Sequence, residues 1–161
     1  MDKNRLSAED IGQLYERHGP ALMAYACGFG LDRGHAEDAV HAVFHRLLQN
    51  PVVMPQNPAG YLYRAVRNAA LNARRDGARV TVVDEACFVH AGGNVAASLA
   101  LQEALGELPE EQREVVVMRV WSGMTLEEIA TASDAPLNTI ASRYRYALGK
   151  LREKLWPYEG Q

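Results

Sequence analysis

The side chains best suited to chemistry in this 161-residue sequence are basic, and they gather in two segments that are far apart along the chain. Each segment carries five Lys or Arg residues against one acid, although the whole chain has a formal net charge of −3. Phosphate groups respond to such a local excess of positive charge rather than to the total. The two segments therefore indicate two separate contacts with nucleic acid. The basic residues are Arg64, Arg67, Arg74, Arg75 and Arg79 in the first segment, and Arg143, Arg145, Lys150, Arg152 and Lys154 in the second.

The first basic segment overlaps a predicted helix over residues 61–75, whose two faces differ in chemistry. At 100° per residue, the small and aliphatic residues between Leu62 and Ala73 fall on one side. The opposite side combines aromatic, amide and guanidinium groups, which can stack on unpaired bases and hold phosphates. A solvated charged face is the alternative interpretation. The residues of this side are Tyr61, Arg64, Asn68, Asn72 and Arg75, with Arg67 and Arg74 flanking them.

The second basic segment lies in a motif that is typical of paired DNA-recognising helices. Thr125 and Glu128 have the spacing of a capping box, which predicts the start of a helix. Ser133-Asp-Ala-Pro136 then supplies turn residues, and a second, basic helix follows with apolar residues along one face. Two short helices around a tight turn predict a helix-turn-helix. An ordinary helical hairpin with a solvated basic face is the alternative.

His41 and His45 lie one helical turn apart and suggest a metal ion, with Glu37 or His35 as a further ligand. No second ligand motif accompanies them in the sequence. Solvated histidines beside a partner-binding face are therefore the favoured interpretation, and no metal or other cofactor is predicted. The sequence also lacks a Gly-rich phosphate loop, a paired-carboxylate motif and a nucleophile–base motif. We do not expect an enzyme.

The elements that must position these side chains are predicted to be helical. A capping box at residues 7–10 starts a helix that Gly19-Pro20 should break or bend, and an apolar stripe marks another helix over 36–48. The loop over 50–58 carries three apolar residues between prolines, which either dock a partner or tuck into the core. No apolar run reaches the length of a membrane span, and no signal peptide is evident, which favours the cytoplasm.

A change of character between residues 77 and 98 divides the chain. Two short β-like runs and little helical signal predict a linker there, and its apolar content suggests that it packs the flanking parts together and hides the basic helices. Helical patterns return over 99–108, 109–121, 125–132 and 136–155. The predicted fold class is all-α, with two small helical domains joined by a linker. The predicted boundaries are 7–76 for the first domain, 77–98 for the linker and 99–156 for the second domain.

Several motifs along the chain occur in an order and at a spacing that a known protein family shares. The first domain contains Ala36-Glu-Asp-Ala-Val-His-Ala-Val-Phe44 and Asn57-Pro-Ala-Gly-Tyr-Leu-Tyr-Arg-Ala-Val-Arg-Asn68. The second contains Ala104-Leu-Gly-Glu-Leu-Pro-Glu-Glu-Gln-Arg-Glu-Val116, followed by Glu128-Ile-Ala130 and Thr139-Ile-Ala-Ser-Arg143. Over about residues 10–155 the chain resembles the extracytoplasmic-function (ECF) sigma factors, the smallest members of the sigma-70 family of bacteria.

The resemblance implies a sigma factor that binds core RNA polymerase and directs promoter-specific initiation of transcription. The first domain would be a region 2-like domain of three or four helices, and the second a region 4-like helix-turn-helix domain. An anti-sigma factor is a further expected partner, membrane insertion is not expected, and the free protein is expected to be a monomer.

The same resemblance assigns the site residues to three surfaces. The polymerase-binding residues would be Glu37, Asp38, His41, Phe44 and His45. The residues that recognise and open the minus-ten promoter element would be Tyr61, Arg64, Arg67, Asn68 and Arg75. The residues that contact the minus-thirty-five element through its major groove would be Asn138, Thr139, Ser142, Arg143 and Arg145.

The sequence departs from the family pattern at several of these positions. His41 and Ala42 stand where the family has Gln and an acid, and Ser133-Asp134-Ala135 replaces the usual Leu-Gly-Ile of the turn. Two functions from other classes are therefore kept as alternatives. One is a sigma-like interaction module that binds polymerase or a regulator without initiating transcription. The other is a stand-alone helix-turn-helix repressor, which would dimerise on a palindrome without polymerase.

Overall fold

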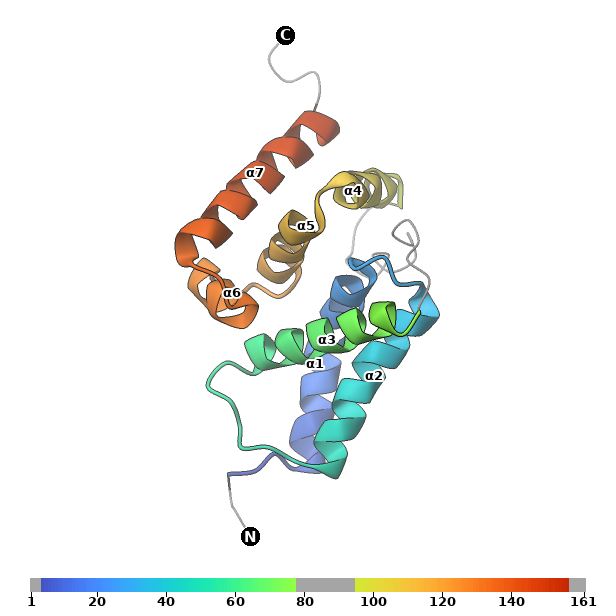
Figure 1. The fold of residues 1–161 in the computed structure, drawn as a ribbon, viewed down its shortest axis with the longest axis vertical. Helices are drawn as coiled ribbons and strands as arrows, with labels where there is room; N and C mark the ends of the chain where they lie inside the picture. Colours follow the sequence, from blue (N-terminus) through green and yellow to red (C-terminus); the bar gives the residue numbers. More distant parts are fainter. Residues whose placement is uncertain (1–3, 78–94, 157–161) are drawn as a thin grey trace.

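The computed structural model describes residues 4–77 and 95–156, and their regular structure is helical apart from an isolated bridge between Arg5 and Val53. The first half of the chain forms α1 (Ala8–Cys27), α2 (Arg33–Gln49) and α3 (Pro58–Arg75), and the second half forms α4 to α7 (Figure 1). The predicted all-α class is confirmed. The elements of the second half are α4 (Val95–Glu107), α5 (Glu110–Val116), the π-helical turn η2 (Val117–Trp121), α6 (Leu126–Ser133) and α7 (Leu137–Leu155).

Side-chain caps fix where the three helices of the first half begin. Ser7 forms the predicted capping box with Asp10 at the start of α1. Asp32 accepts from the backbone N–H of His35 at 2.8 Å and caps α2. Asn57 caps α3, whose first residue is Pro58, a residue that suits the first turn because the missing N–H has no helical partner there. The third helix therefore begins three residues before the predicted Tyr61.

The helix α1 runs without a break through Pro20, which corrects the predicted interruption at Gly19-Pro20. The carbonyl of Glu16 loses its helical partner at Pro20. Both residues are exposed, so this carbonyl can be hydrated, while Ala21 and Leu22 are buried. The buried face thus keeps the helix intact. The helix ends at Cys27, with Gly28 as its C-cap residue.

The loop between α2 and α3 is only partly tucked into the core. Val52 packs against the core, and its carbonyl accepts from the backbone N–H of Leu6 at 2.9 Å. Val53 and Met54 are instead about half exposed, at 52% and 46%. Leu48, predicted to belong to the apolar stripe of α2, is also exposed, at 52%. Val52 is therefore packed against the core, whereas Val53 and Met54 face solvent.

The second half begins earlier than predicted and contains the expected helix-turn-helix. α4 starts at Val95, inside the predicted linker, whose residues 78–94 lie outside the described residues. The predicted helix over 109–121 starts at Glu110 and changes to π-helical geometry in η2. The capping box of Thr125 and Glu128 starts α6, as predicted. α7 then buries Ile140, Ala147 and Leu151 along one face.

The turn between α6 and α7 is a Schellman motif built on a strained residue. The backbone N–H of Ala135 bonds to the carbonyl of Ala130 at 3.0 Å, and that of Asp134 to the carbonyl of Thr131 at 3.3 Å. Asp134 adopts the left-handed conformation, with φ 53° and ψ 47°. This conformation costs most residues free energy that glycine does not lose.

Asp134→Gly is therefore expected to raise the free energy of unfolding by about 0.5 kcal/mol, the relief of strain being partly offset by the greater freedom of glycine in the unfolded chain. Asp134→Ala is the control, because alanine keeps the Cβ and lacks the local hydrogen bonding that helps Asp adopt this conformation. Urea titrations of both variants measure the effect. A glycine variant less stable than the alanine variant would contradict the explanation.

The two halves pack on each other around one continuous hydrophobic cluster. Buried residues of α1, α2 and α3 join those of α4 to α7 in this cluster. Across the junction α3 contacts α6 and α1 contacts η2, and Figure 1 shows α5 and α6 lying beside α1 and α3. A Cβ at Gly60 would lie 3.7 Å from the Cβ of Ala132, so the helices α3 and α6 approach closely. The halves are thus packed together in this structure.

Candidate nucleic-acid interface

The polar face of α3 forms one wall of a groove whose other wall is α2. The groove has a volume of about 250 Å³. Its polar lining combines a phenol, amides and guanidinium groups, which can stack on a base and hydrogen-bond its edges. Those residues are Arg46 from α2 and Tyr61, Arg64, Asn68 and Asn72 from α3.

Tyr61 lies where this polar groove meets an apolar hollow of about 210 Å³. The hollow is lined by Val43, Leu47 and Val52, and the ring of Tyr61 borders both spaces. Tyr61 is 39% exposed, so a flat ligand can reach it from solvent. The predicted residues Tyr61, Arg64 and Asn68 thus share one accessible surface. Arg75 is exposed near the end of α3 and donates to Asn72 Oδ1 at 3.0 Å.

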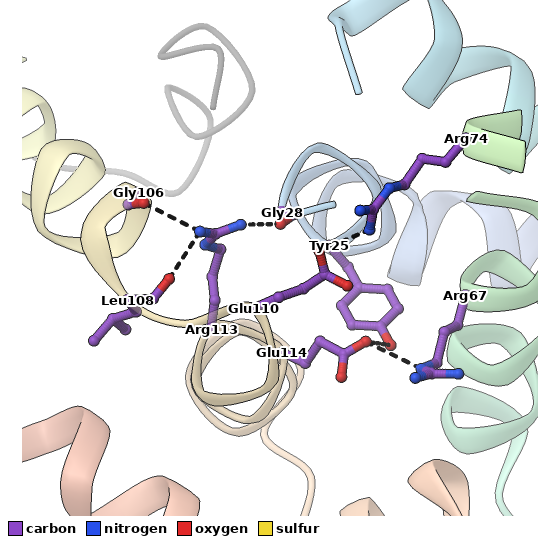
Figure 2. Close-up of polar contacts among 9 residues, drawn as sticks. All are labelled: Tyr25, Gly28, Arg67, Arg74, Gly106, Leu108, Glu110, Arg113 and Glu114. Carbon is purple, nitrogen blue, oxygen red and sulfur yellow. Dashed lines mark hydrogen bonds and ion pairs between the residues drawn. The ribbon is translucent and has the colours of Figure 1, made fainter. Parts of the chain in front are cut away.

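Arg67 and Arg74 lie differently, because they pair with carboxylates of α5 across the junction between the halves. Arg67 Nε is 3.0 Å from Glu114 Oε1, and Arg74 Nη1 is 2.7 Å from Glu110 Oε2 (Figure 2). Arg67 was predicted to face DNA together with Tyr61. In this structure its guanidinium instead contacts the second half, and 38% of its side chain stays exposed.

Glu114 is a buried carboxylate between the two halves. It is 7% exposed and accepts hydrogen bonds from Arg67 and from the hydroxyl of Tyr25, the latter at 3.3 Å. Burial raises the pKa of Glu114, and the charge of Arg67 opposes that rise. Burial, followed by the charge of Glu114, raises the pKa of the Tyr25 phenol well above its usual range. Burial also raises the pKa of Tyr63, whose hydroxyl pairs with Ser122 Oγ, to about 12.

The guanidinium of Arg113 donates hydrogen bonds to three parts of the backbone. Its guanidinium donates to the carbonyls of Leu105 at 2.9 Å, Gly106 at 3.1 Å and Leu108 at 2.9 Å, at the end of α4 and in the turn that follows. A further bond reaches the carbonyl of Gly28 in the first half (Figure 2). Arg113 is 9% exposed, and burial lowers the pKa of its guanidinium. It satisfies carbonyls that the end of a helix would otherwise leave unpaired.

The predicted major-groove residues gather on the first half of α7. Asn138 and Arg145 are exposed, and Thr139, Ser142 and Arg143 are half-buried. Arg145 lies over the ring of Tyr146, with its guanidinium carbon 5.5 Å from the ring centroid. Arg143 Nη2 is 3.7 Å from Glu111 Oε2, a third carboxylate of α5. The helix therefore presents donors toward solvent while its apolar face packs on α4, α5 and α6.

The predicted polymerase-binding residues lie on α2, and one of them differs from expectation. Asp38, His41 and His45 are exposed and Glu37 is half-buried, but Phe44 is 5% exposed. The ring of Phe44 packs edge-on against Tyr15 at a centroid distance of 5.1 Å. Phe44 therefore packs beneath this surface and is not part of it, because its side of α2 faces the core. The hydroxyl of Tyr15 pairs with His41 Nε2 at 3.2 Å.

The described residues offer neither a cluster of metal ligands nor a helix suited to a membrane. Over residues 4–77 and 95–156, no three His, Cys, Asp or Glu side chains come together in a way that could hold a metal ion. Within the same ranges, none of the helices combines the length and the apolar character that crossing a membrane requires.

The sequence did not predict that the carboxylates of α5 form ion pairs with the basic residues. Glu110 and Glu111 lie in the first turn of α5, where acidic residues are favourable, and Glu114 follows one turn later. Their spacing did carry a signal, since positions 110, 111 and 114 place three negative charges on adjacent faces of a short helix. The arginines that they contact are 32 or more positions away in sequence, so no local pattern identifies the pairs.

Comparisons with known proteins agree with the order of these elements. The family model for sigma-70 region 2 matches residues 14–80, and that for sigma-70, region 4 matches residues 98–151. Among curated proteins, the chain is similar to an RNA polymerase sigma-E factor of Streptomyces antibioticus, with 42% identity over 55 residues. It is also similar to the ECF RNA polymerase sigma factor RpoE of Cereibacter sphaeroides, with 38% identity over 55 residues. These matches span 34% of this chain and 31% and 30% of the relatives.

Two solved structures are similar over nearly their whole length. One is the sigma factor RpoE in complex with the anti-sigma factor NepR from Bartonella quintana, with a TM-score of 0.72 and 25% identity over 92% of this chain and 98% of that one. The other is CnrH in complex with the cytosolic domain of CnrY, with a TM-score of 0.66 and 25% identity over 95% of this chain and 92% of that one.

Proposed function

Because the chain belongs to the sigma-70 family, two of whose regions together match about three quarters of it, we propose that it is an ECF RNA polymerase sigma factor. In this proposal it binds core RNA polymerase and directs the enzyme to promoters, without catalysis of its own. One observation carries the proposal. The chain presents two accessible basic faces, on α3 and α7, in segments that match the family's regions 2 and 4 in order.

Each of the three surfaces has one proposed binding role. Residues 7–76 would bind polymerase through the exposed side of α2 and hold the minus-ten element in the groove of α3. Residues 99–156 would bind the minus-thirty-five element through α7, with residues 77–98 as the linker. An isolated repressor needs one such surface, whereas a polymerase subunit that spans a promoter needs two. The proposed compartment is the cytoplasm.

The groove between α2 and α3 suits an unstacked base better than a duplex. A base can enter it only after leaving the helical stack, which costs a few kcal/mol, and stacking on an aromatic ring offsets part of that cost. Tyr61 is the ring placed to do so, with Asn68 and Arg64 beside it for polar contacts. The strand opening that initiation requires would therefore be favoured by capture at Tyr61.

Tyr61→Ala is expected to reduce the equilibrium fraction of open promoter complex about 10-fold, because stacking on an aromatic side chain contributes about 1–3 kcal/mol per base. Tyr61→Phe should retain most of it, since the ring remains. Permanganate reactivity of thymines in the opened region measures the fraction. The same variants on a promoter with a permanently unpaired bubble provide the control, where the defect should shrink. Equal losses for Ala and Phe would contradict a stacking role.

A partner that occludes this protein when initiation is not required is part of the proposal. Of the two solved structures that the chain resembles, RpoE is in complex with the anti-sigma factor NepR, and CnrH is in complex with the cytosolic domain of CnrY. We propose an anti-sigma factor for this chain by that similarity. The free protein is proposed to be a monomer.

Run-off transcription with core polymerase and a genomic promoter library tests the proposed function. Specific transcripts that depend on the added protein are expected. The absence of any specific transcript, with polymerase binding retained, would overturn it in favour of the interaction module. That alternative has one structural argument, because His41 and Ala42 lie exposed on the proposed polymerase-binding side of α2 and depart from the family pattern. Tight binding to a palindrome without polymerase would instead favour a repressor.

A further inference from the structure

The segment that precedes α1 pairs with the loop between α2 and α3 in antiparallel fashion. The backbone N–H of Leu6 donates to the carbonyl of Val52 at 2.9 Å, and the backbone N–H of Met54 donates to the carbonyl of Asn4 at 3.1 Å. Figure 1 shows this segment running beside the loop at the end of the first half where the chain begins. The loop is therefore held by a segment that is distant in sequence.

Arg5 and Val53 lie opposite each other between these two hydrogen bonds. The bonds flank the pair without joining its own backbone groups, and in such a pair the two side chains lie close together on the same face. Both residues are exposed. Leu6 and Val52 have their side chains on the opposite face, and both pack in or against the hydrophobic core. The side chain of Arg5 therefore lies beside the solvent-facing part of the loop.

The same loop borders the groove that is proposed to hold an unstacked base. Val52 lines the apolar hollow that meets this groove at Tyr61, and Arg46 of α2 lines both spaces. None of residues 50–57 carries a charge, so the loop offers no cation to the phosphates of a strand that enters the groove past it. Arg5 supplies a cation at this place. It lies outside both basic segments, so the charge pattern of the sequence did not identify it.

We propose that residues 4–6 extend the DNA-binding surface of the first half. Arg5 binds a phosphate of the strand whose base is held at Tyr61, and the pairing of its segment with the loop places it there. This inference rests on the proposed function, because it adds a contact to the same site. A guanidinium suits the role, since its planar set of N–H groups donates to phosphate oxygens in a fixed geometry.

Features on both sides of the pairing order this segment and the loop before DNA binds. Leu6 is 4% exposed and directly precedes Ser7, whose capping box begins α1, so the point where the segment leaves the helix is fixed. Pro51 and Pro55 restrict the backbone of the loop on either side of Val53. A contact made from an ordered segment loses less conformational entropy on binding than one made from a free chain end.

The test uses core polymerase loaded with the full-length protein and a fluorescent single-stranded oligonucleotide in an anisotropy titration. The oligonucleotide carries the opened non-template strand of a promoter that the genomic library yields in the run-off assay. Arg5→Ala removes the proposed contact, and Arg5→Lys keeps the charge. The matched control is Arg17→Ala, which makes the same change of charge at an exposed position of α1 that belongs to none of the three proposed surfaces.

Arg5→Ala is expected to weaken binding about 5-fold and to reduce the slope of log affinity against log salt concentration by about 0.7, the value for one phosphate contact on a single strand. Arg5→Lys should retain most of the slope, and Arg17→Ala should change neither quantity.

A second variant tests whether the pairing places Arg5. Leu6→Pro removes the N–H that donates to Val52 and keeps an apolar side chain, so Arg5→Ala should have little further effect in this background. Circular dichroism checks that helix content is retained. If Leu6→Pro fails to fold, Met54→Pro, which removes the other hydrogen bond of the pairing, takes its place.

Two results would overturn the inference while the proposed function stands. An unchanged salt slope in Arg5→Ala would mean that Arg5 binds no phosphate. A full effect of Arg5→Ala in the proline background would mean that the pairing with the loop does not place it. Failure of the proposed function would appear separately, as wild-type protein that yields no specific transcript from the library, and it would overturn this inference as well.

Discussion

Arg113→Ala is expected to lower the free energy of unfolding by about 3 kcal/mol, because one side chain takes several buried hydrogen bonds with it. The guanidinium satisfies four backbone carbonyls, and a buried acceptor left without a donor costs about 1–3 kcal/mol. The methyl group of alanine replaces none of these bonds and leaves a cavity between α4 and α5. Urea denaturation followed by circular dichroism measures the change.

Two further variants make this prediction specific to the hydrogen bonds. Arg113→Lys keeps the charge but offers one compact ammonium group to carbonyls arranged around a planar fork, so it should recover only part of the loss. Arg119→Ala is the matched control, because Arg119 is exposed and donates to one carbonyl, that of Met124, at 2.9 Å. It should cost about 1 kcal/mol or less. Equal losses at the two positions would contradict the role of Arg113.

Arg67→Ala is expected to destabilise the folded protein by about 2 kcal/mol, whereas Glu114→Gln is expected to be neutral or slightly stabilising at neutral pH. Removal of the arginine leaves Glu114 with a buried charge and one remaining donor, Tyr25. Removal of the negative charge instead relieves the desolvation cost, and the glutamine amide can still accept from Tyr25. The double variant should therefore be more stable than Arg67→Ala alone. Thermal unfolding of the four proteins of this cycle measures the coupling.

The pH dependence of this pair follows from the direction of the shift. The pKa of Glu114 is raised in the folded protein, with burial as the larger cause and Arg67 opposing it. The stability that its proton contributes is thus fully present below the ordinary glutamate pKa and is lost as pH rises through the raised value. Glu114→Gln should remove this loss, so its advantage over the wild type should vanish in acid. An advantage that grows on acidification would contradict the assignment.

Local sequence determined most of the secondary structure. The capping boxes at Ser7 and Thr125 and the turn at Asp134 depend on hydrogen bonds between residues a few positions apart, and all three were visible in the sequence. The apolar face of α7 follows from helical spacing in the same way. The helix boundaries were predicted less well. Asn57 and Pro58 start α3 three residues before Tyr61, the aromatic residue at which the start was predicted.

Burial overrode the expectation from sequence where a residue's local preference and its surroundings disagree. Pro20 removes one helical hydrogen bond, and the exposed position of Glu16 and Pro20 allows water to bind the freed carbonyl. Phe44 belongs to a motif assigned to polymerase binding, but its ring packs on Tyr15. The chain position shows which residues share a helix face, and only packing decides whether that face meets solvent or core.

The sequence by itself determined that this protein has two basic helices, a helix-turn-helix and the ordered motifs of its family. These features depend on residue type and short-range spacing. Only the tertiary structure decided that Arg67 and Arg74 face Glu114 and Glu110, which lie 47 and 36 positions away. Such pairs form when two surfaces that are distant in sequence meet, and the strength of each pair depends on the water that the contact excludes.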